Sequence, residues 1–166
     1  MEKTISVLIA DDEQFVRNGL RFLINQIPGF NVVAEASNGR EAVSKAVQLE
    51  PEVLILDVKM APMNGLEALE TIKSRLPDSR TIILSGHDDF SYAQSALRYG
   101  ADDYLLKPAN LSKIRKVLLA MQRMIEERDN DKQKREKIHE QLEYSNSAFL
   151  ESFYRDLLFG ELSDDD

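Results

Sequence analysis

The 166-residue chain has no cysteine and no tryptophan, and it has only two histidines. Without cysteine there can be no disulfide framework and no thiolate zinc site, and two histidines are too few for a histidine-rich metal centre. Long apolar runs are also missing: the apolar stretch near the N-terminus is too short for a signal peptide, and no run approaches a membrane span. We therefore expect a cytoplasmic protein that does not contact a membrane.

Positive charge is scarce as well. The chain has 21 Lys and Arg against 29 Asp and Glu, which gives a formal net charge of −8. This balance lacks the basic surface that binds nucleic acid, so we expect no direct DNA contact by these residues. The 43% hydrophobic content is sufficient for one ordinary core, with a smaller appendage of a few dozen residues.

Short apolar runs alternate with stretches that have helical spacing. The runs lie at residues 6–10, 31–36, 53–56, 81–86 and 103–107. Each intervening stretch is long enough for a helix, and proline or glycine residues stand near the proposed boundaries. Alternating strands and helices predict an α/β fold, a doubly wound five-stranded parallel sheet with helices on both faces.

The last third of the chain has a different pattern. Helical spacing continues after Pro108 to about residue 125, but residues 126–137 hold five acids and five bases with no apolar side chain. Apolar residues return from Ile138, which predicts a second amphipathic helix. We therefore expect three parts: a domain over residues 1–125, a charged helical linker over 126–137 and an amphipathic helical extension over 138–166.

Functional groups in an open α/β sheet gather beyond the carboxyl ends of the strands. The residues at these positions are Asp11, Asp12, Asp57, Ser85 and Lys107. Carboxylates held 4 Å apart repel by roughly 4 kcal/mol per pair at an effective dielectric constant of 20, so the cluster needs cations. Lys107 can supply one charge and Mg²⁺ the rest. The set predicts phosphoryl chemistry, with the Asp57 carboxylate as nucleophile.

Each of these residues also has a purely structural interpretation. Asp11 or Asp12 could be the N-cap of the helix that begins near Gln14. Ser85 could belong to an ordinary turn, and Lys107 could simply end a strand. Their joint occurrence at the ends of different strands favours the functional interpretation.

Several motifs together resemble the receiver domain of two-component response regulators, from about Ser6 to Met124. They are IADDE at residues 9–13, LILDVKM at 54–60, Asn64-Gly65, ILSG at 83–86 and YLLKP at 104–108. The resemblance implies a flavodoxin-like fold with strand order 2-1-3-4-5. It also implies that Asp57 accepts a phosphoryl group from a sensor histidine kinase.

By the same resemblance, Mg²⁺ would be bound directly by Asp12 and through water by Asp11. Asp57 and the backbone carbonyl of Lys59 would complete the protein ligands. The chain would then be a phosphoacceptor switch and not an enzyme, with self-catalysed phosphotransfer and autodephosphorylation as its only reactions.

The resemblance further implies how the switch operates. Lys107 would contact the phosphoryl oxygens, Ser85 would move toward them, and Tyr104 would change rotamer. These movements would remodel the face made by the fourth helix, fifth strand and fifth helix. We expect a homodimer, formed through that face or through the C-terminal helix.

Two longer segments resemble the subgroup whose receiver is joined to an AraC-type DNA-binding domain that regulates transcription. They lie at residues 85–108 and 149–162. No such domain is present in this chain, so any DNA contact would be made through that absent C-terminal domain. We expect either a truncated piece of a longer protein or a protein that acts through protein contacts alone.

One position departs from the family pattern. The family commonly has proline four residues after the phosphoacceptor, whereas this chain has Ala61 there and Pro62 next. Two other functions stay open. A phosphohydrolase of the haloacid dehalogenase type would need a second Asp where Lys59 stands. A binding module that no longer uses phosphate would not need the complete set of acids, Ser85 and Lys107.

Overall fold

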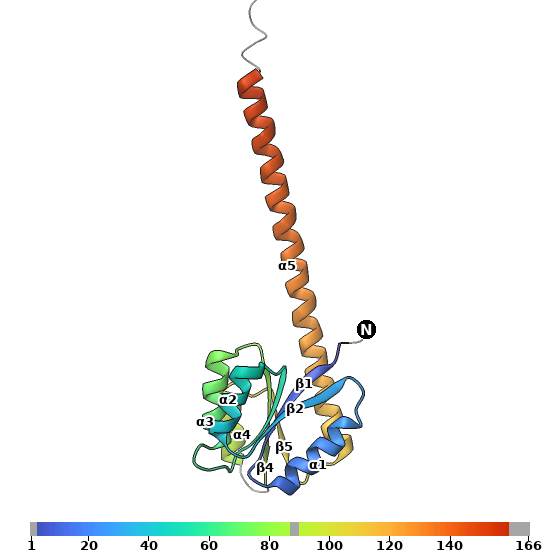
Figure 1. Ribbon diagram of the computed structural model, residues 1–166, viewed down its shortest axis with the longest axis vertical. Helices are drawn as coiled ribbons and strands as arrows, with labels where there is room; N and C mark the ends of the chain where they lie inside the picture. The colour runs from blue at the N-terminus through green and yellow to red at the C-terminus, as the bar shows by residue number, and fades with distance from the viewer. Residues whose placement is uncertain (1–2, 87–89, 160–166) are drawn as a thin grey trace, which may run out of the picture. The chain divides into compact units, whose positions relative to one another are not determined.

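The computed structural model describes residues 3–86 and 90–159 (Figure 1). Strands and helices alternate along the chain from β1 to α5. Their bounds are β1 Ile5–Ala10, α1 Gln14–Asn25, β2 Phe30–Ala36, α2 Gly39–Leu49, β3 Val53–Asp57, α3 Gly65–Arg75, β4 Arg80–Ser85, α4 Phe90–Arg98, β5 Asp103–Leu106 and α5 Leu111–Phe159. The five predicted strands are all present, with ends that differ by at most one residue from the prediction.

The strands form one parallel sheet in the order β2-β1-β3-β4-β5. This is the order of a flavodoxin-like fold, so the predicted fold class is confirmed. Because all strands are parallel, their carboxyl ends lie along one edge of the sheet. The strand order places β1 next to β3 and separates β1 from β5 by two strands.

Helices cover both faces of the sheet, with α1 and the first part of α5 on one side and α2, α3 and α4 on the other (Figure 1). The first cluster packs Ile24 and Leu118 against strand residues such as Ile55. The second packs Ala46 and Leu69 against the opposite face. Two buried faces explain why the strands read as nearly continuous apolar runs instead of alternating patterns.

β3 illustrates this arrangement. All five of its residues are buried, and its side chains alternate between the two clusters: Val53 and Ile55 join the first, Leu54 and Leu56 the second. Asp57 is the last residue of this strand, so a rigid and fully paired segment carries its carboxylate.

The predicted second helix does not exist as a separate element, because α5 is a single helix from Leu111 to Phe159. Residues 126–137 contain no glycine or proline and consist mostly of good helix formers, so nothing interrupts the backbone hydrogen bonding. Of the predicted extension, residues 160–166 lie outside the described part of the chain.

The chain divides into two units, Met1–Ile125 and Glu126–Asp166. The first contains the sheet and its helices. The described part of the second is helical, with exposed aromatic and aliphatic side chains such as Leu142, Phe149 and Phe153. Among residues 3–86 and 90–159, none of the helices combines the length and apolarity that a membrane crossing needs.

Candidate functional site

The Asp57 carboxylate lies at the carboxyl edge of the sheet. Strand pairing aligns Asp57 with Leu84 of β4, and the next backbone N–H, from Val58, donates to the Leu84 carbonyl at 3.1 Å. The Asp57 residue is only 4% exposed. The sheet therefore fixes the backbone of this acid on the side of β4.

Asp11 and Asp12 follow β1, the strand on the other side of β3. Asp11 is fully buried, and its backbone N–H donates to the Ala36 carbonyl at 3.1 Å. One Asp11 carboxylate oxygen accepts the backbone N–H of Glu13 at 2.9 Å. Asp12 is exposed. The two acids thus differ: one is held inside the protein and the other faces solvent.

Neither acid is the N-cap of α1. Glu13 occupies that position, and its side chain makes no capping hydrogen bond. The structural interpretation of Asp11 and Asp12 as caps is therefore wrong, because α1 begins at Gln14 as expected and Glu13 is the residue directly before it. Both carboxylates therefore lie at the edge of the sheet without serving as the helix cap.

Lys107 links the ends of β1, β3 and β5. Its backbone N–H donates to the Ser85 carbonyl at 2.7 Å, which ties the end of β5 to β4. Its ammonium nitrogen lies 2.7 Å from the Asp11 Oδ2 and 3.2 Å from the Asp57 Oδ1. One half-buried cation therefore contacts two buried carboxylates.

The pKa of the Asp57 carboxyl and the pKa of the Lys107 ammonium group are both raised. Burial raises the pKa of the Asp57 carboxyl from its ordinary 3.8 to about 6, and the charge of Asp11 adds to this effect while Lys107 opposes it. Burial alone would lower the pKa of Lys107, but its hydrogen bond to Asp11 and the charges of Asp57 and Asp11 outweigh burial and raise it. Lys107 is thus charged at neutral pH, yet it does not fully offset the cost of ionising Asp57.

The three acids fit a divalent cation. Oxygens of Asp11, Asp12 and Asp57 all lie within 4.8 Å of one another. Burial is the main cause of the raised pKa of Asp57, and the negative charges of Asp11 and Asp12 add to it. Carboxylate oxygens are the preferred protein ligands of hard ions such as Mg²⁺, which would supply the missing charge.

The other predicted site residues lie near this edge in different ways. Ser85 ends β4 and is 1% exposed, and its hydroxyl donates to the Gly86 carbonyl at 3.4 Å. Tyr104 is half-buried in β5 and packs against the cluster of α2, α3 and α4. Lys59 follows Asp57 by two residues with its side chain exposed. The structure brings Lys107 into contact with two of the acids, Asp11 and Asp57.

The segment after β3 is held by Asn64 and Gly65. Asn64 caps α3 in a capping box with Glu67, which satisfies two helix donors reciprocally. Gly65 donates its N–H to the Val58 carbonyl at 3.0 Å, and a Cβ at this position would lie 2.0 Å from the Asp57 carbonyl oxygen. Only glycine allows this approach. The Ala61-Pro62 peptide bond in the same segment is cis.

Sequence reasoning missed one residue beside the acids. The guanidinium of Arg17, in α1, donates to the backbone carbonyl of Asp11 at 2.7 Å. The sequence signal was a basic residue six positions after Asp11, about one helical turn into α1. Such spacing does not by itself show that the side chain turns back toward the strand end.

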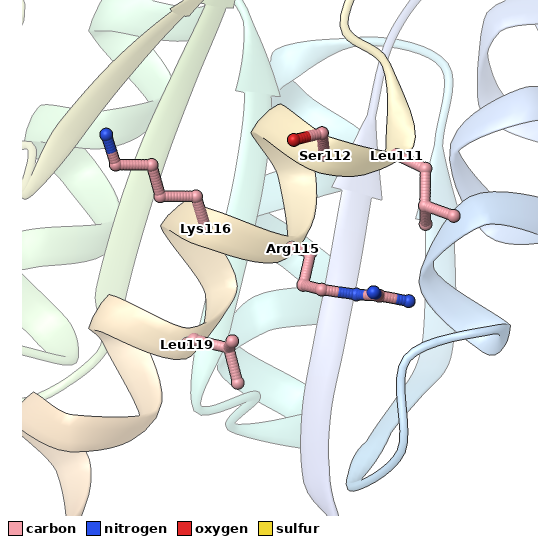
Figure 2. A pocket seen from close by; sticks show the side chains of 5 residues that line it. All are labelled: Leu111, Ser112, Arg115, Lys116 and Leu119. Carbon is pink, nitrogen blue, oxygen red and sulfur yellow. The ribbon is translucent and has the colours of Figure 1, made fainter.

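The surface hollows of the first unit include the following two. One, of about 250 Å³, borders the site because it includes Lys107, and Phe15, Val16 and Leu84 contribute apolar side chains to it. The other lies along α5 and shares no residue with the acid cluster; Figure 2 shows its five side chains, Leu111, Ser112, Arg115, Lys116 and Leu119. Of these two, the first is the one placed to affect access to Lys107.

Comparison with known proteins adds to this geometry. The model of the response regulator receiver domain matches residues 7–119. A similar protein is the transcriptional regulatory protein YesN of Bacillus subtilis (strain 168), described as uncharacterized, which is 33% identical over 93% of this chain and 42% of its own length. The nitrate/nitrite response regulator NarL of Escherichia coli (strain K12) is 36% identical over 64% of this chain and 49% of its own.

Solved structures include the REC domain of AraT, a response regulator from Geobacillus stearothermophilus. It is 38% identical, covers 78% of this chain and 98% of its own, and superposes with a TM-score of 0.68. The present chain spans less than half the length of YesN and NarL. The matched segment runs from within β1 to the first part of α5 and includes the acid cluster and Lys107. The chain therefore belongs to the response regulator receiver domain family.

Proposed function

We propose that this chain is a phosphorylation-activated switch in which Asp57 accepts a phosphoryl group from a sensor histidine kinase. The observation that carries the proposal is the contact of one ammonium group, that of Lys107, with both Asp11 and Asp57 beside a third carboxylate. A buried nucleophile that is flanked by positive charge and by oxygen ligands suits phosphoryl transfer, in which positioning and charge neutralisation dominate.

In the proposed reaction, a carboxylate oxygen of Asp57 forms a bond to phosphorus. The bond between phosphorus and the kinase histidine nitrogen breaks, and its electron pair stays on that nitrogen. The ammonium group of Lys107, already 3.2 Å from Asp57, would neutralise charge on the transferred oxygens. Asp57 must be ionised to attack, so its raised pKa would reduce its reactivity in acidic solution.

We propose Mg²⁺ as the cofactor. Asp12, Asp57 and the backbone carbonyl of Lys59 would hold it directly and Asp11 through water. When bound, the ion supplies positive charge that stabilises the phosphoryl oxygens and the acid cluster. The cluster of oxygens within 4.8 Å supports this assignment.

Phosphorylation would be read out through Ser85 and Tyr104. Ser85 ends the strand next to Asp57, and Tyr104 lies in the following strand, opposite Ile83 in the pairing of β4 with β5. A shift of the serine toward the phosphoryl group would change the packing of the tyrosine and the face formed by α4, β5 and α5. A homodimer formed through this face or through the C-terminal part of α5 is the proposed output.

Beyond this chain, we propose a C-terminal DNA-binding domain that regulates transcription, with residues 126–137 as linker and 138–166 as the start of the connection. The similarity to this chain covers only 42% of YesN and 49% of NarL, which are named as regulators, and this supports a further domain. Their names do not specify a domain of the AraC type. That assignment rests on the resemblance of residues 85–108 and 149–162 alone.

The test is the intact mass of the chain after incubation with acetyl phosphate, with and without Mg²⁺. The expected result is one phosphoryl group that requires Mg²⁺ and is lost in Asp57→Asn. Asp131→Asn, which changes an exposed carboxylate of α5, should label like the native chain. Sustained hydrolysis of a small phosphate ester would instead favour a phosphohydrolase, and no adduct at all would favour a binding module that does not use phosphate.

A further inference from the structure

The side chain of Arg17 contacts the candidate site at the backbone of Asp11 and not at its carboxylate. Its Nη1 donates to the Asp11 carbonyl oxygen at 2.7 Å, and the side chain is half-buried. The backbone of Arg17 is fixed in turn, because its N–H donates to the Glu13 carbonyl at 3.1 Å in the first turn of α1. The guanidinium therefore connects the start of the helix to the end of β1.

The carbonyl held by Arg17 belongs to the peptide unit between Asp11 and Asp12. That unit is planar, so its orientation helps to determine the direction in which the backbone continues into Asp12. The neighbouring groups of Asp11 already have partners: its N–H bonds to Ala36, and its two carboxylate oxygens bond to Glu13 and Lys107. Arg17 completes this set by fixing the carbonyl.

We propose that Arg17 is a positioning residue, whose hydrogen bond to the Asp11 carbonyl orients the two neighbouring acids for binding Mg²⁺. The proposal rests on the proposed function of the acid cluster. It assigns to α1 a role in metal affinity, although α1 contributes no metal ligand. Residues that orient a metal ligand without binding the metal themselves commonly change the affinity for the metal about tenfold or more.

Simple electrostatics predicts the opposite sign for the same residue. A guanidinium near the acids repels an incoming divalent cation, so removing its charge should strengthen Mg²⁺ binding if charge were its only influence. Removing a positioning hydrogen bond should weaken binding. The direction of the change therefore separates the two roles.

α1 offers a matched control in Arg21, one turn after Arg17. Its guanidinium pairs with the Glu35 carboxylate on β2, and no contact with Asp11 is described for it. Arg21→Ala removes the same charge from the same helix without touching the β1 end. A general effect of charge or of helix stability should appear in both variants.

The experiment is calorimetric titration of the native chain, Arg17→Ala, Arg17→Lys and Arg21→Ala with Mg²⁺. Thermal unfolding in EDTA establishes that each variant is folded. We expect Arg17→Ala to weaken binding about tenfold and Arg21→Ala to leave it nearly unchanged. Arg17→Lys, which keeps a donor and the charge, should fall between Arg17→Ala and the native chain. At saturating Mg²⁺, Arg17→Ala should regain the native rate of phosphorylation by acetyl phosphate.

Equal or tighter Mg²⁺ binding by Arg17→Ala would overturn the positioning role while leaving the proposed function intact. Equal losses in Arg17→Ala and Arg21→Ala would also overturn it, because they would indicate a general effect of α1. A native chain that does not bind Mg²⁺ would overturn the proposed metal site and, with it, the role of Arg17.

Discussion

The Asp57 carboxylate is costly to ionise in the folded chain. It is buried at a strand end, and its pKa of about 6 lies above the ordinary value of 3.8. Between these two values the folded state holds a proton that the unfolded state has lost, so stability falls as the pH rises. Above about pH 6 the full cost is present, whereas below about 3.8 it is absent.

Because ionising the Asp57 carboxyl costs free energy in the folded chain, we expect Asp57→Asn to stabilise the fold at neutral pH without Mg²⁺. The expected gain is roughly 1 to 3 kcal/mol at pH 7.5, and it should shrink as the pH is lowered toward 4. Urea unfolding in EDTA at several pH values measures it, with Asp131→Asn as the control. An Asp57→Asn variant that is less stable than the native chain at pH 7.5 would contradict this account.

Gly65 and Gly19 should respond oppositely to substitution by alanine. At Gly65 a Cβ would meet the Asp57 carbonyl oxygen at 2.0 Å, so the segment after β3 must shift. We expect Gly65→Ala to cost roughly 1 to 3 kcal/mol and to slow phosphorylation by acetyl phosphate. Gly19 has open space around it within α1, so Gly19→Ala should stabilise by about 0.5 to 1 kcal/mol.

Chemical denaturation of both glycine variants gives the two free energies of unfolding. If Gly65→Ala were as stable as the native chain and accepted phosphate at the native rate, the close approach would not constrain the site. A destabilised Gly19→Ala would mean that other atoms fill the space around Gly19 in the folded chain.

Single residues show where sequence reasoning succeeds and fails. The convergence of Asp11, Asp57 and Lys107 follows from topology, because parallel strands bring their carboxyl ends to one edge. The bond of Arg17 to a backbone carbonyl depends on a side-chain rotamer and on the path of the β1–α1 connection, which residue types alone do not determine. The roles of Ser85, Tyr104 and Lys59 stay predictions.

At the scale of elements, periodicity predicted every strand but not the unity of α5. Where the apolar stripe is lost, over residues 126–137, the sequence predicts a charged helical linker with a second amphipathic helix after it. The structure has one helix there, because a helix ends where the backbone is interrupted and not where one face becomes polar. The pattern of polar side chains predicts whether a helix faces solvent or protein better than it predicts the residue at which the helix ends.

α1 presents an apolar surface beside Lys107. Phe15 is 87% exposed and borders the hollow of about 250 Å³ that also includes Lys107. If the proposed kinase approaches Asp57 on this side, Phe15→Ser should slow phosphotransfer from a histidine kinase by about tenfold or more. It should leave labelling by acetyl phosphate nearly unchanged, since that small molecule needs no such contact.

The control is Phe22→Ser, on the same helix, which is exposed but does not line this hollow. The measurement compares the rates of phosphotransfer to the native chain and to both variants, from a kinase that labels the native chain. Equal rates for Phe15→Ser and the native chain would place the kinase contact elsewhere.

For the whole molecule, the prediction concerns assembly. We expect phosphorylation to shift the chain toward a dimer, measured by sedimentation velocity with and without acetyl phosphate and Mg²⁺. Leu119→Ser changes the hollow on α5 and should reduce the part of association that depends on phosphorylation. Phe153→Ser changes an exposed ring that stacks on Phe149 in the second unit, and should reduce the part that does not.

A chain that stays monomeric under both conditions would contradict assembly through either surface. If Phe153→Ser abolished all association and Leu119→Ser none, the second unit alone would hold the dimer together. The exposed apolar side chains of residues 138–159 make some such association favourable, because burying each one gains roughly 1.5 to 3 kcal/mol.

The bond between Lys107 and Asp11 joins residues 96 positions apart in the sequence. Two strands, β3 and β4, lie between the strands that carry them. During synthesis, the ribosome must therefore release β5 before the cluster of charges can be completed. A nascent chain that ends before Lys107 would present its acids without their ammonium partner, so competence for phosphoryl transfer would arise only after β5 has been made and would report that the sheet is complete.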